Sequence, residues 1–226
     1  MGPIQLVVFD LAGTTIADDG GVVLNSLVET VHIHDLPGTP DELNALMGMN
    51  KREVFGMLAA RRYPAGSATA EHVAEEALAT FVTHISTAYE RHLAPMPGAE
   101  EVFIFLRARG IKIAIDTGFD AAVGGLIMRR LDWPGRMIDL AVFSSDVLRG
   151  RPAPYMIFHA MEHLDVHDVH QVMKIGDTPS DLEEGFNAGC SEVIGVVSGA
   201  HSATTLGAYR HTRLLPSVAD LPALFT

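Results

Sequence analysis

The strongest constraint on the fold of this chain is a series of short apolar segments that each end near a small, acidic or hydroxyl residue. These segments span Gln5–Asp10, Ile111–Thr117, Leu140–Ser145, Val172–Asp177 and Glu192–Val197. Each is rich in Val and Ile and bounded by Gly, Asp, Ser or Thr, which indicates a buried β-strand. Helix-like segments fill gaps between them, over Ala99–Arg109, Tyr155–Leu164 and Asp181–Ala188. This alternation predicts an α/β fold with a mostly parallel sheet covered on both faces.

The segment between about residues 20 and 92 follows a different pattern. It contains no strand-like run, and it is typical of successive helices over Val22–His34, Asp41–Met47, Lys51–Arg61 and Ala70–Arg91. Pro and Gly residues separate these helices, and a Pro-containing linker follows the last of them. We therefore expect a core formed by residues 1–18 and 95–226. A helical cap formed by residues 19–94 is expected as an insertion after the first strand.

The composition excludes several classes of function. Asp and Glu number 28 against 16 Lys and Arg, so the formal net charge is −12. That balance argues against a protein that binds nucleic acid or an anionic membrane. The single cysteine, Cys190, excludes a disulfide framework or a cysteine-based zinc site within one chain. The apolar runs are far shorter than the roughly 20 residues of a membrane span, and we expect a cytoplasmic protein.

Carboxylates follow two of the predicted strands, at the sheet edge where parallel α/β proteins gather their chemistry. Asp10, in the segment FDLAGTT, suits a nucleophile or a metal ligand, and helix capping is the alternative. Asp177 and Asp181, in the segment GDTPSD, offer the oxygen ligands that Mg²⁺ prefers. The alternative for this pair is a capping turn, with Asp181 complementing the helix dipole.

Two further segments carry groups that bind anions. Thr117 and Gly118, in IDTG, can offer an O–H and a backbone N–H to a phosphate group. Arg151, in GRPAP, lies on a loop stiffened by prolines, where a guanidinium can pair with a phosphate or with the nucleophile. Each of these segments is a weak signal when taken alone.

Taken together, FDLAGTT, IDTG, GRPAP and GDTPSD resemble the four motifs of the haloacid dehalogenase superfamily. The predicted helical insert stands where that superfamily has a type-1 cap, and the resemblance covers essentially the whole chain. It implies a Rossmann-like core in which Asp10 is the nucleophile that becomes an aspartyl-phosphate. Thr117 would bind the transferring group, and Arg151 would neutralise charge. Asp10 and Asp177 would bind Mg²⁺, and Asp181 would support the metal site.

One departure from the superfamily pattern concerns the leaving group. Phosphatases of the superfamily usually carry a second Asp two residues after the nucleophile, whereas this chain has Ala12. Loss of such a general acid typically costs about 10²–10⁴-fold when the leaving group is an alkoxide. Alanine resembles instead the phosphonoacetaldehyde hydrolase (phosphonatase) family, whose leaving group is carbon. There the Ala12 carbonyl would bind Mg²⁺, and a cap lysine forms an imine with the aldehyde.

The predicted cap is similar to that of the phosphonatase family in part. Met47, Gly48 and Lys51 match the family's Met-Gly-x-x-Lys segment, which gives Lys51 the imine-forming position. A neighbouring cation and burial would lower the pKa of its amine. Val54, however, stands where the family has a histidine, and no cysteine precedes Cys190. The chain resembles a phosphonatase-like sister group more than phosphonatase itself.

The resemblance implies a small phosphonate or phosphate substrate, and it suggests a homodimer that pairs through the caps. Two rival functions stay open, a phosphomonoesterase and a non-catalytic module that senses phosphonate or phosphate. A zinc site is also conceivable, because His159 and His163 would share one helix face. No acid completes an HExxH pattern there, so we interpret these side chains as surface histidines.

Overall fold

The computed structural model describes residues 3–225 of the chain. Its centre is a six-stranded sheet in which every pair of neighbouring strands is parallel, with the strand order β3-β2-β1-β4-β5-β6. The strands are β1 (Leu6–Phe9), β2 (Lys112–Thr117), β3 (Leu140–Phe143), β4 (Val172–Gly176), β5 (Glu192–Val196) and β6 (Arg213–Leu215). The predicted α/β fold with a parallel sheet is confirmed.

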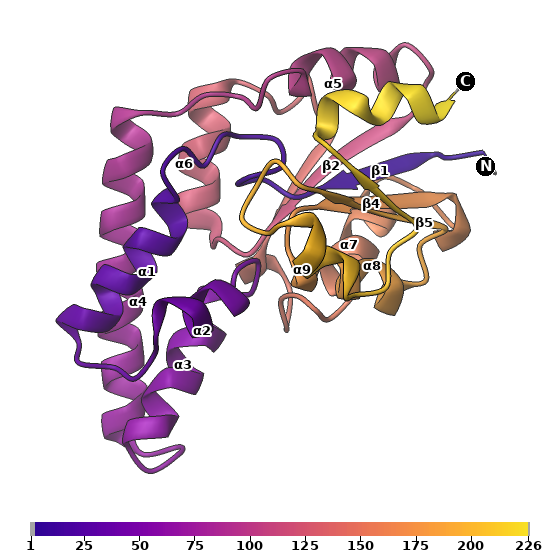
Figure 1. Ribbon diagram of the computed structural model, residues 1–226. Helices are drawn as coiled ribbons and strands as arrows, with labels where there is room; N and C mark the ends of the chain where they lie inside the picture. The colour runs from indigo at the N-terminus through magenta and orange to yellow at the C-terminus, as the bar shows by residue number, and fades with distance from the viewer. Residues whose placement is uncertain (1–2, 226) are drawn as a thin grey trace.

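Helices cover both faces of this sheet, as Figure 1 shows. They are α5 (Ala99–Arg107), α6 (Ala121–Leu131), α7 (Tyr155–His163), α8 (Pro179–Ala188), α9 (Ala203–Gly207), and the short 3-10 helices η1 (Ser144–Asp146), η2 (Val169–Gln171) and η3 (Val218–Phe225). Along β1, Val7 and Phe9 join the apolar cluster that contains α5, α6 and η3, whereas Leu6 and Val8 join the cluster with α7 and α8. Because both faces are buried, β1 is apolar at every position.

The remaining helices form a group of their own, which we call the helical unit. It consists of α1 (Val22–Ile33), α2 (Pro40–Ala45), α3 (Lys51–Arg62) and α4 (Ala68–Arg91). Figure 1 shows it to one side of the sheet, beyond the carboxyl end of β1, where α6 packs against α4. Although α4 has 24 residues, no helix between residues 3 and 225 is long and apolar enough to cross a membrane.

Some elements differ from the sequence prediction for identifiable reasons. Helix α8 begins at Pro179 rather than Asp181, because Thr178 is its N-cap and forms a capping box with Asp181. Helix α6 was not predicted, since two adjacent glycines weaken its helical pattern. One of them, Gly124, lies where a Cβ atom would be 2.3 Å from the Phe143 ring, so the close packing requires glycine. Strand β6 has only three residues, too few to show a pattern.

Candidate active site

The three predicted strand-end residues lie side by side because their strands are neighbours. Asp10 directly follows β1, Thr117 ends β2 and Asp177 directly follows β4, and β1 lies between β2 and β4. The turn after Asp10 is held by the Thr15 hydroxyl, which donates to the Asp10 carbonyl oxygen over 2.9 Å. Gly13 has a φ of 91°, and a Cβ there would lie 2.5 Å from a carboxylate oxygen of Asp177. Glycine therefore lets this turn approach Asp177.

The carboxylates of the GDTPSD segment are fixed in different ways. Asp177 accepts a hydrogen bond from the Thr14 hydroxyl over 2.9 Å and another from the Ala200 amide over 2.7 Å. Asp181 accepts through Oδ2 from the amide and hydroxyl of Thr178, over 3.1 and 2.6 Å. Both carboxylates are fully buried. The capping alternative thus applies to Asp181, whereas Asp177 lies before the helix and contacts the turn that follows Asp10.

Arg151 lies beneath Asp10 and contacts four carboxylates. Its side chain is fully buried, with Nη1 at 2.7 Å from Asp10 and 2.9 Å from Asp181. Its Nη2 lies 2.5 Å from Asp116, and its Nε lies 3.2 Å from Glu184. The guanidinium therefore pairs with the predicted nucleophile, one of the two partners expected from the sequence. Because these acids surround the Arg151 guanidinium, it is not open to a substrate phosphate. Its contacts suit it to hold the Asp10 carboxylate in position.

Lys174 is a second buried cation that the sequence analysis missed. It lies in the middle of β4, where its Nζ contacts Asp116 and lies 3.2 Å from Asp181 and 3.0 Å from Glu184. A lysine inside an otherwise apolar strand was the available signal, because such a position is buried and a buried cation needs acidic partners. Asp116 and Glu184 are those partners. The sequence placed Asp116 at a strand end without giving it a role.

The loop that precedes α3 rests directly on the core. A Cβ at Gly118 would lie 2.6 Å from the carbonyl oxygens of Gly48 and Met49, and one at Gly48 would lie 2.4 Å from the Thr178 hydroxyl. The Asn50 side chain also donates to the Ser144 carbonyl oxygen over 3.4 Å. Glycines thus allow backbone from the helical unit and backbone from the core to meet above Asp10.

A small cavity of about 20 Å³ lies under this loop. Seven of the predicted site residues line it, namely Asp10, Ala12, Met47, Gly48, Lys51, Thr117 and Gly118. Val23, Phe119 and Thr178 complete its wall. Arg151, Asp177 and Asp181 lie behind the cavity rather than on its surface. The volume corresponds to roughly one water molecule, so the helical unit is closed over Asp10 in this structure.

Lys51 is buried in this cavity although it is the first residue of α3. It is 5% exposed, and its Nζ donates to the Met49 carbonyl oxygen over 2.9 Å. Burial lowers the pKa of its ammonium group, the Arg151 charge lowers it further, and Asp10 opposes them, which leaves the pKa at about 8. Lys51 is therefore not the exposed lysine that the first turn of a helix usually carries.

The acids around the cavity carry more negative charge than their cationic neighbours neutralise. Burial and the nearby Asp181 raise the pKa of Asp10 to about 6, against the opposing effect of Arg151 and Lys174. Burial also raises the pKa of Asp177 well above its usual range, and the charge of Asp10 raises it further. The region of Asp10 and Asp177 therefore favours an additional positive charge.

Asp10, Asp116 and Asp181 are close enough to hold a metal ion, with ligand oxygens within 4.8 Å of one another. Arg151 and Lys174 already pair with these three acids. In the chain between residues 3 and 225, no histidine belongs to such a group. His159 and His163 stack on each other, with ring centroids 4.0 Å apart.

Comparison with known proteins identifies the family of this chain. The family model of haloacid dehalogenase-like hydrolases matches residues 4–189. A phosphonoacetaldehyde hydrolase from Bacillus cereus is 32% identical over 204 residues, which cover 87% of this chain and 77% of that protein. Another, from Parabacteroides distasonis, is 36% identical over 127 residues, covering 56% of this chain and 48% of that protein.

Solved structures share the same fold. A phosphonoacetaldehyde hydrolase-like protein from Oleispira antarctica superposes with a TM-score of 0.78 at 23% identity, over 99% of this chain and 91% of that one. A β-phosphoglucomutase homologue from Bacteroides vulgatus gives a TM-score of 0.82 at 19% identity, over 99% and 88%. The sequence match and the fold lead to one conclusion: the chain belongs to the haloacid dehalogenase-like hydrolases and is a phosphonatase-like enzyme of that family.

Proposed function

We propose that this enzyme hydrolyses the carbon–phosphorus bond of a small phosphonate that carries a carbonyl group, such as phosphonoacetaldehyde. The observation that carries this proposal is the burial of Lys51 in the same cavity as Asp10, with a pKa of about 8. An amine with that pKa is partly unprotonated near neutral pH, as imine formation requires. The alanine at position 12 supports the same conclusion, since a carbon leaving group activated through an imine needs no acid there.

The reaction then divides between two residues. The Lys51 amine attacks the carbonyl carbon and forms an imine with loss of water, and the protonated imine withdraws electrons from the adjacent carbon. A carboxylate oxygen of Asp10 attacks phosphorus, and the electron pair of the carbon–phosphorus bond moves toward the imine nitrogen. Arg151 holds Asp10 through Oδ1 at 2.7 Å and so orients the attack. Water hydrolyses the aspartyl-phosphate, and hydrolysis of the resulting enamine frees Lys51.

The residues near Asp10 fit Mg²⁺, the ion that hydrolases of this family generally use. Burial and repulsion from neighbouring carboxylates raise the pKa of both Asp10 and Asp177. A bound divalent cation would offset that repulsion. We propose Asp10, Asp177 and the Ala12 carbonyl as ligands. Asp181 would support the site, because its oxygens already face Thr178, Arg151 and Lys174. When bound, Mg²⁺ would neutralise charge on the phosphoryl oxygens.

The helical unit would act as a cap in this proposal. A cavity of about 20 Å³ does not admit a phosphonate, so the loop over Asp10 must move away for entry and return for the reaction. Closure also buries Lys51, which links the lowered pKa of its amine to the closed state. Pairing of two caps in a homodimer and a cytoplasmic location stay predictions from the resemblance and the composition.

Phosphate release from phosphonoacetaldehyde tests the function, with and without chelation of Mg²⁺. We expect release by the wild type with Mg²⁺, loss on chelation, and loss in Lys51→Ala. Lys112→Ala is the matched control, because that side chain contacts the Leu164 carbonyl oxygen away from the cavity. Release from simple phosphate esters that is indifferent to Lys51→Ala would show a phosphomonoesterase instead. Stabilisation by phosphonate without any turnover would show a sensing module.

A further inference from the structure

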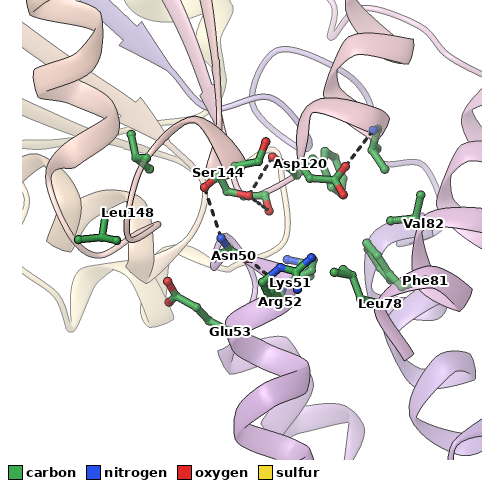
Figure 2. A pocket seen from close by; sticks show the side chains of 15 residues that line it. Asn50, Lys51, Arg52, Glu53, Leu78, Phe81, Val82, Asp120, Ser144 and Leu148 are labelled. Carbon is green, nitrogen blue, oxygen red and sulfur yellow. Dashed lines mark hydrogen bonds between the residues drawn. The ribbon is translucent and has the colours of Figure 1, made fainter. Parts of the chain in front are cut away.

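A second, larger cavity adjoins the reaction cavity. Its volume is about 340 Å³, and it lies between α3 and α4 on one side and the core loops after β2 and β3 on the other. Lys51, Gly118 and Phe119 line both cavities. In Figure 2, Lys51 lies in the middle of this space, between side chains of α4 and the loop that carries Leu148. Lys51 therefore lies at the junction between the two cavities.

The wall of the larger cavity on the α4 side is apolar. Leu78, Phe81 and Val82 lie together there, as Figure 2 shows, and the Phe119 ring lies 6.4 Å from the Phe81 ring. Across the space, Leu148 is 89% exposed. Phe81 is only 1% exposed, so a ligand between these two sides would remove from water mainly the apolar surface of Val82 and Leu148, which is the favourable term in binding an alkyl group.

The charged side chains around this cavity have partners within the protein. Arg52 pairs with Glu75. Glu53 accepts a hydrogen bond from the Gly150 amide over 3.3 Å. Asp120 caps α6 by accepting from two backbone amides, each over 3.1 Å. These pairings favour an uncharged occupant, because a charged ligand would compete with contacts that are already made.

We propose that the natural substrates are 2-oxoalkylphosphonates, ketones of the form R–CO–CH₂–PO₃²⁻ whose alkyl group R occupies the 340 Å³ cavity. This inference rests on the proposed function, and it extends that function from an aldehyde to larger ketones. The carbonyl carbon must reach Lys51, and the phosphonate must reach Asp10. With the phosphonate at Asp10, the second cavity that Lys51 lines is the space left for R, so R extends from the carbonyl carbon into it.

The chemistry balances as it does for the aldehyde. Lys51 condenses with the ketone and releases water, Asp10 takes the phosphoryl group, and the electron pair of the carbon–phosphorus bond forms an enamine. Protonation of the enamine carbon and hydrolysis give R–CO–CH₃, and water converts the aspartyl-phosphate to inorganic phosphate. The net reaction consumes one water and yields a methyl ketone and phosphate. It requires neither an oxidant nor a reductant.

A series of 2-oxoalkylphosphonates with methyl, propyl and pentyl as R tests this inference in the wild-type enzyme with Mg²⁺. Phosphate release gives kcat/KM for each compound, and the ketones are compared with one another because their carbonyl groups are equally reactive. We expect kcat/KM to rise about fourfold for each added methylene, which corresponds to about 0.8 kcal/mol. Phosphonoacetaldehyde is measured in parallel as the test of the proposed function itself.

Two tryptophan variants on α4 locate the alkyl group. Val82→Trp fills the cavity from its α4 side and should lower the ratio of kcat/KM for pentyl over methyl at least about tenfold. Thr83→Trp, at the exposed neighbouring position, should keep the wild-type ratio. Thermal unfolding of both variants separates a local block from a folding defect. The chain-length series of the wild type is independent of either variant.

The possible results separate the two proposals. Cleavage of phosphonoacetaldehyde with flat or falling kcat/KM along the ketone series, or with no ketone cleaved, overturns this inference and leaves the proposed function standing. Phosphate release from none of the carbonyl phosphonates overturns both. A rising series whose ratio is unchanged in a folded Val82→Trp also overturns the assignment, because R would then bind outside this cavity.

Discussion

The titration of Lys51 is the most direct quantity to measure. Its pKa of about 8 results from burial and from the Arg151 charge, opposed by Asp10. At pH 7 about one tenth of such lysines is unprotonated, whereas a lysine with the ordinary value of 10.5 is unprotonated in about one molecule in 3,000. The structure therefore predicts about 300-fold more free amine at Lys51 than an exposed lysine would offer.

Reductive trapping with an aldehyde measures this difference. The chain has three lysines, Lys51, Lys112 and Lys174. After incubation with acetaldehyde and cyanoborohydride, mass spectrometry of peptides reports the rate of ethylation at each position. We expect the rate at Lys51 to rise about tenfold per pH unit below pH 8 and to level off above it. Lys174 should stay unmodified, because Asp116, Glu184 and Asp181 raise its pKa against the effect of burial.

Two results would refute this reasoning about Lys51. A trapping rate at Lys51 that still rises between pH 9 and pH 10 would show an ordinary ammonium group, and the electrostatic argument would then be wrong. Trapping that is faster at Lys112 than at Lys51 would show that Lys51 is inaccessible to carbonyl compounds. In either case the burial of Lys51 would be a packing feature only.

Three further changes test other parts of the site. Asp10→Asn should abolish phosphate release and keep reductive trapping at Lys51. The midpoint of the trapping pH profile should fall below pH 8, because the Asp10 charge raises the pKa of Lys51. Loss of trapping would contradict separate roles for these two residues. Gly118→Ala places a Cβ 2.6 Å from two carbonyl oxygens of the helical unit and should lower kcat/KM about 100-fold, whereas Gly56→Ala, whose Cβ meets open space, should not. Equal kinetics in both variants would show that closure tolerates the contact. Lys174→Met leaves buried acids without their cation and should cost about 3–5 kcal/mol in urea unfolding, and a cost under about 1 kcal/mol would show that Arg151 alone compensates them.

Local patterns were sufficient to predict much of the fold. Five strands were expected from their Val- and Ile-rich segments, and the ends of β1, β2 and β4 were expected to gather the chemistry. The strand order then places Asp10 between Thr117 and Asp177. Missing from the prediction were α6, α9 and β6, where glycines or short length leave no period to detect. Residue type and spacing carry the fold where each element is long enough to show its own pattern.

The buried charge network could not be predicted in the same way. Arg151 and Lys174 are far apart in the chain from Asp10 and Asp116, and only the tertiary fold, which pairs β4 with β1 and β1 with β2 and carries the loop before α7 to Asp10, brings them together. Motif spacing identified Arg151 because its loop matches a known pattern. Glu184 had no such signal, since an acid on a helix is usually exposed.

The two buried lysines show why position alone does not determine chemistry. Both side chains are removed from water, and burial by itself favours a lower pKa for each ammonium group. Around Lys174 three carboxylates outweigh that effect and keep the ammonium charged, so this residue serves as a structural cation beneath the site. Around Lys51 the nearest charges are one guanidinium and one carboxylate, burial prevails, and the amine becomes available near neutral pH. Ala12 fits the proposed function in the same way: position 12 offers no acid for an oxygen leaving group, and an imine at Lys51 would need none there.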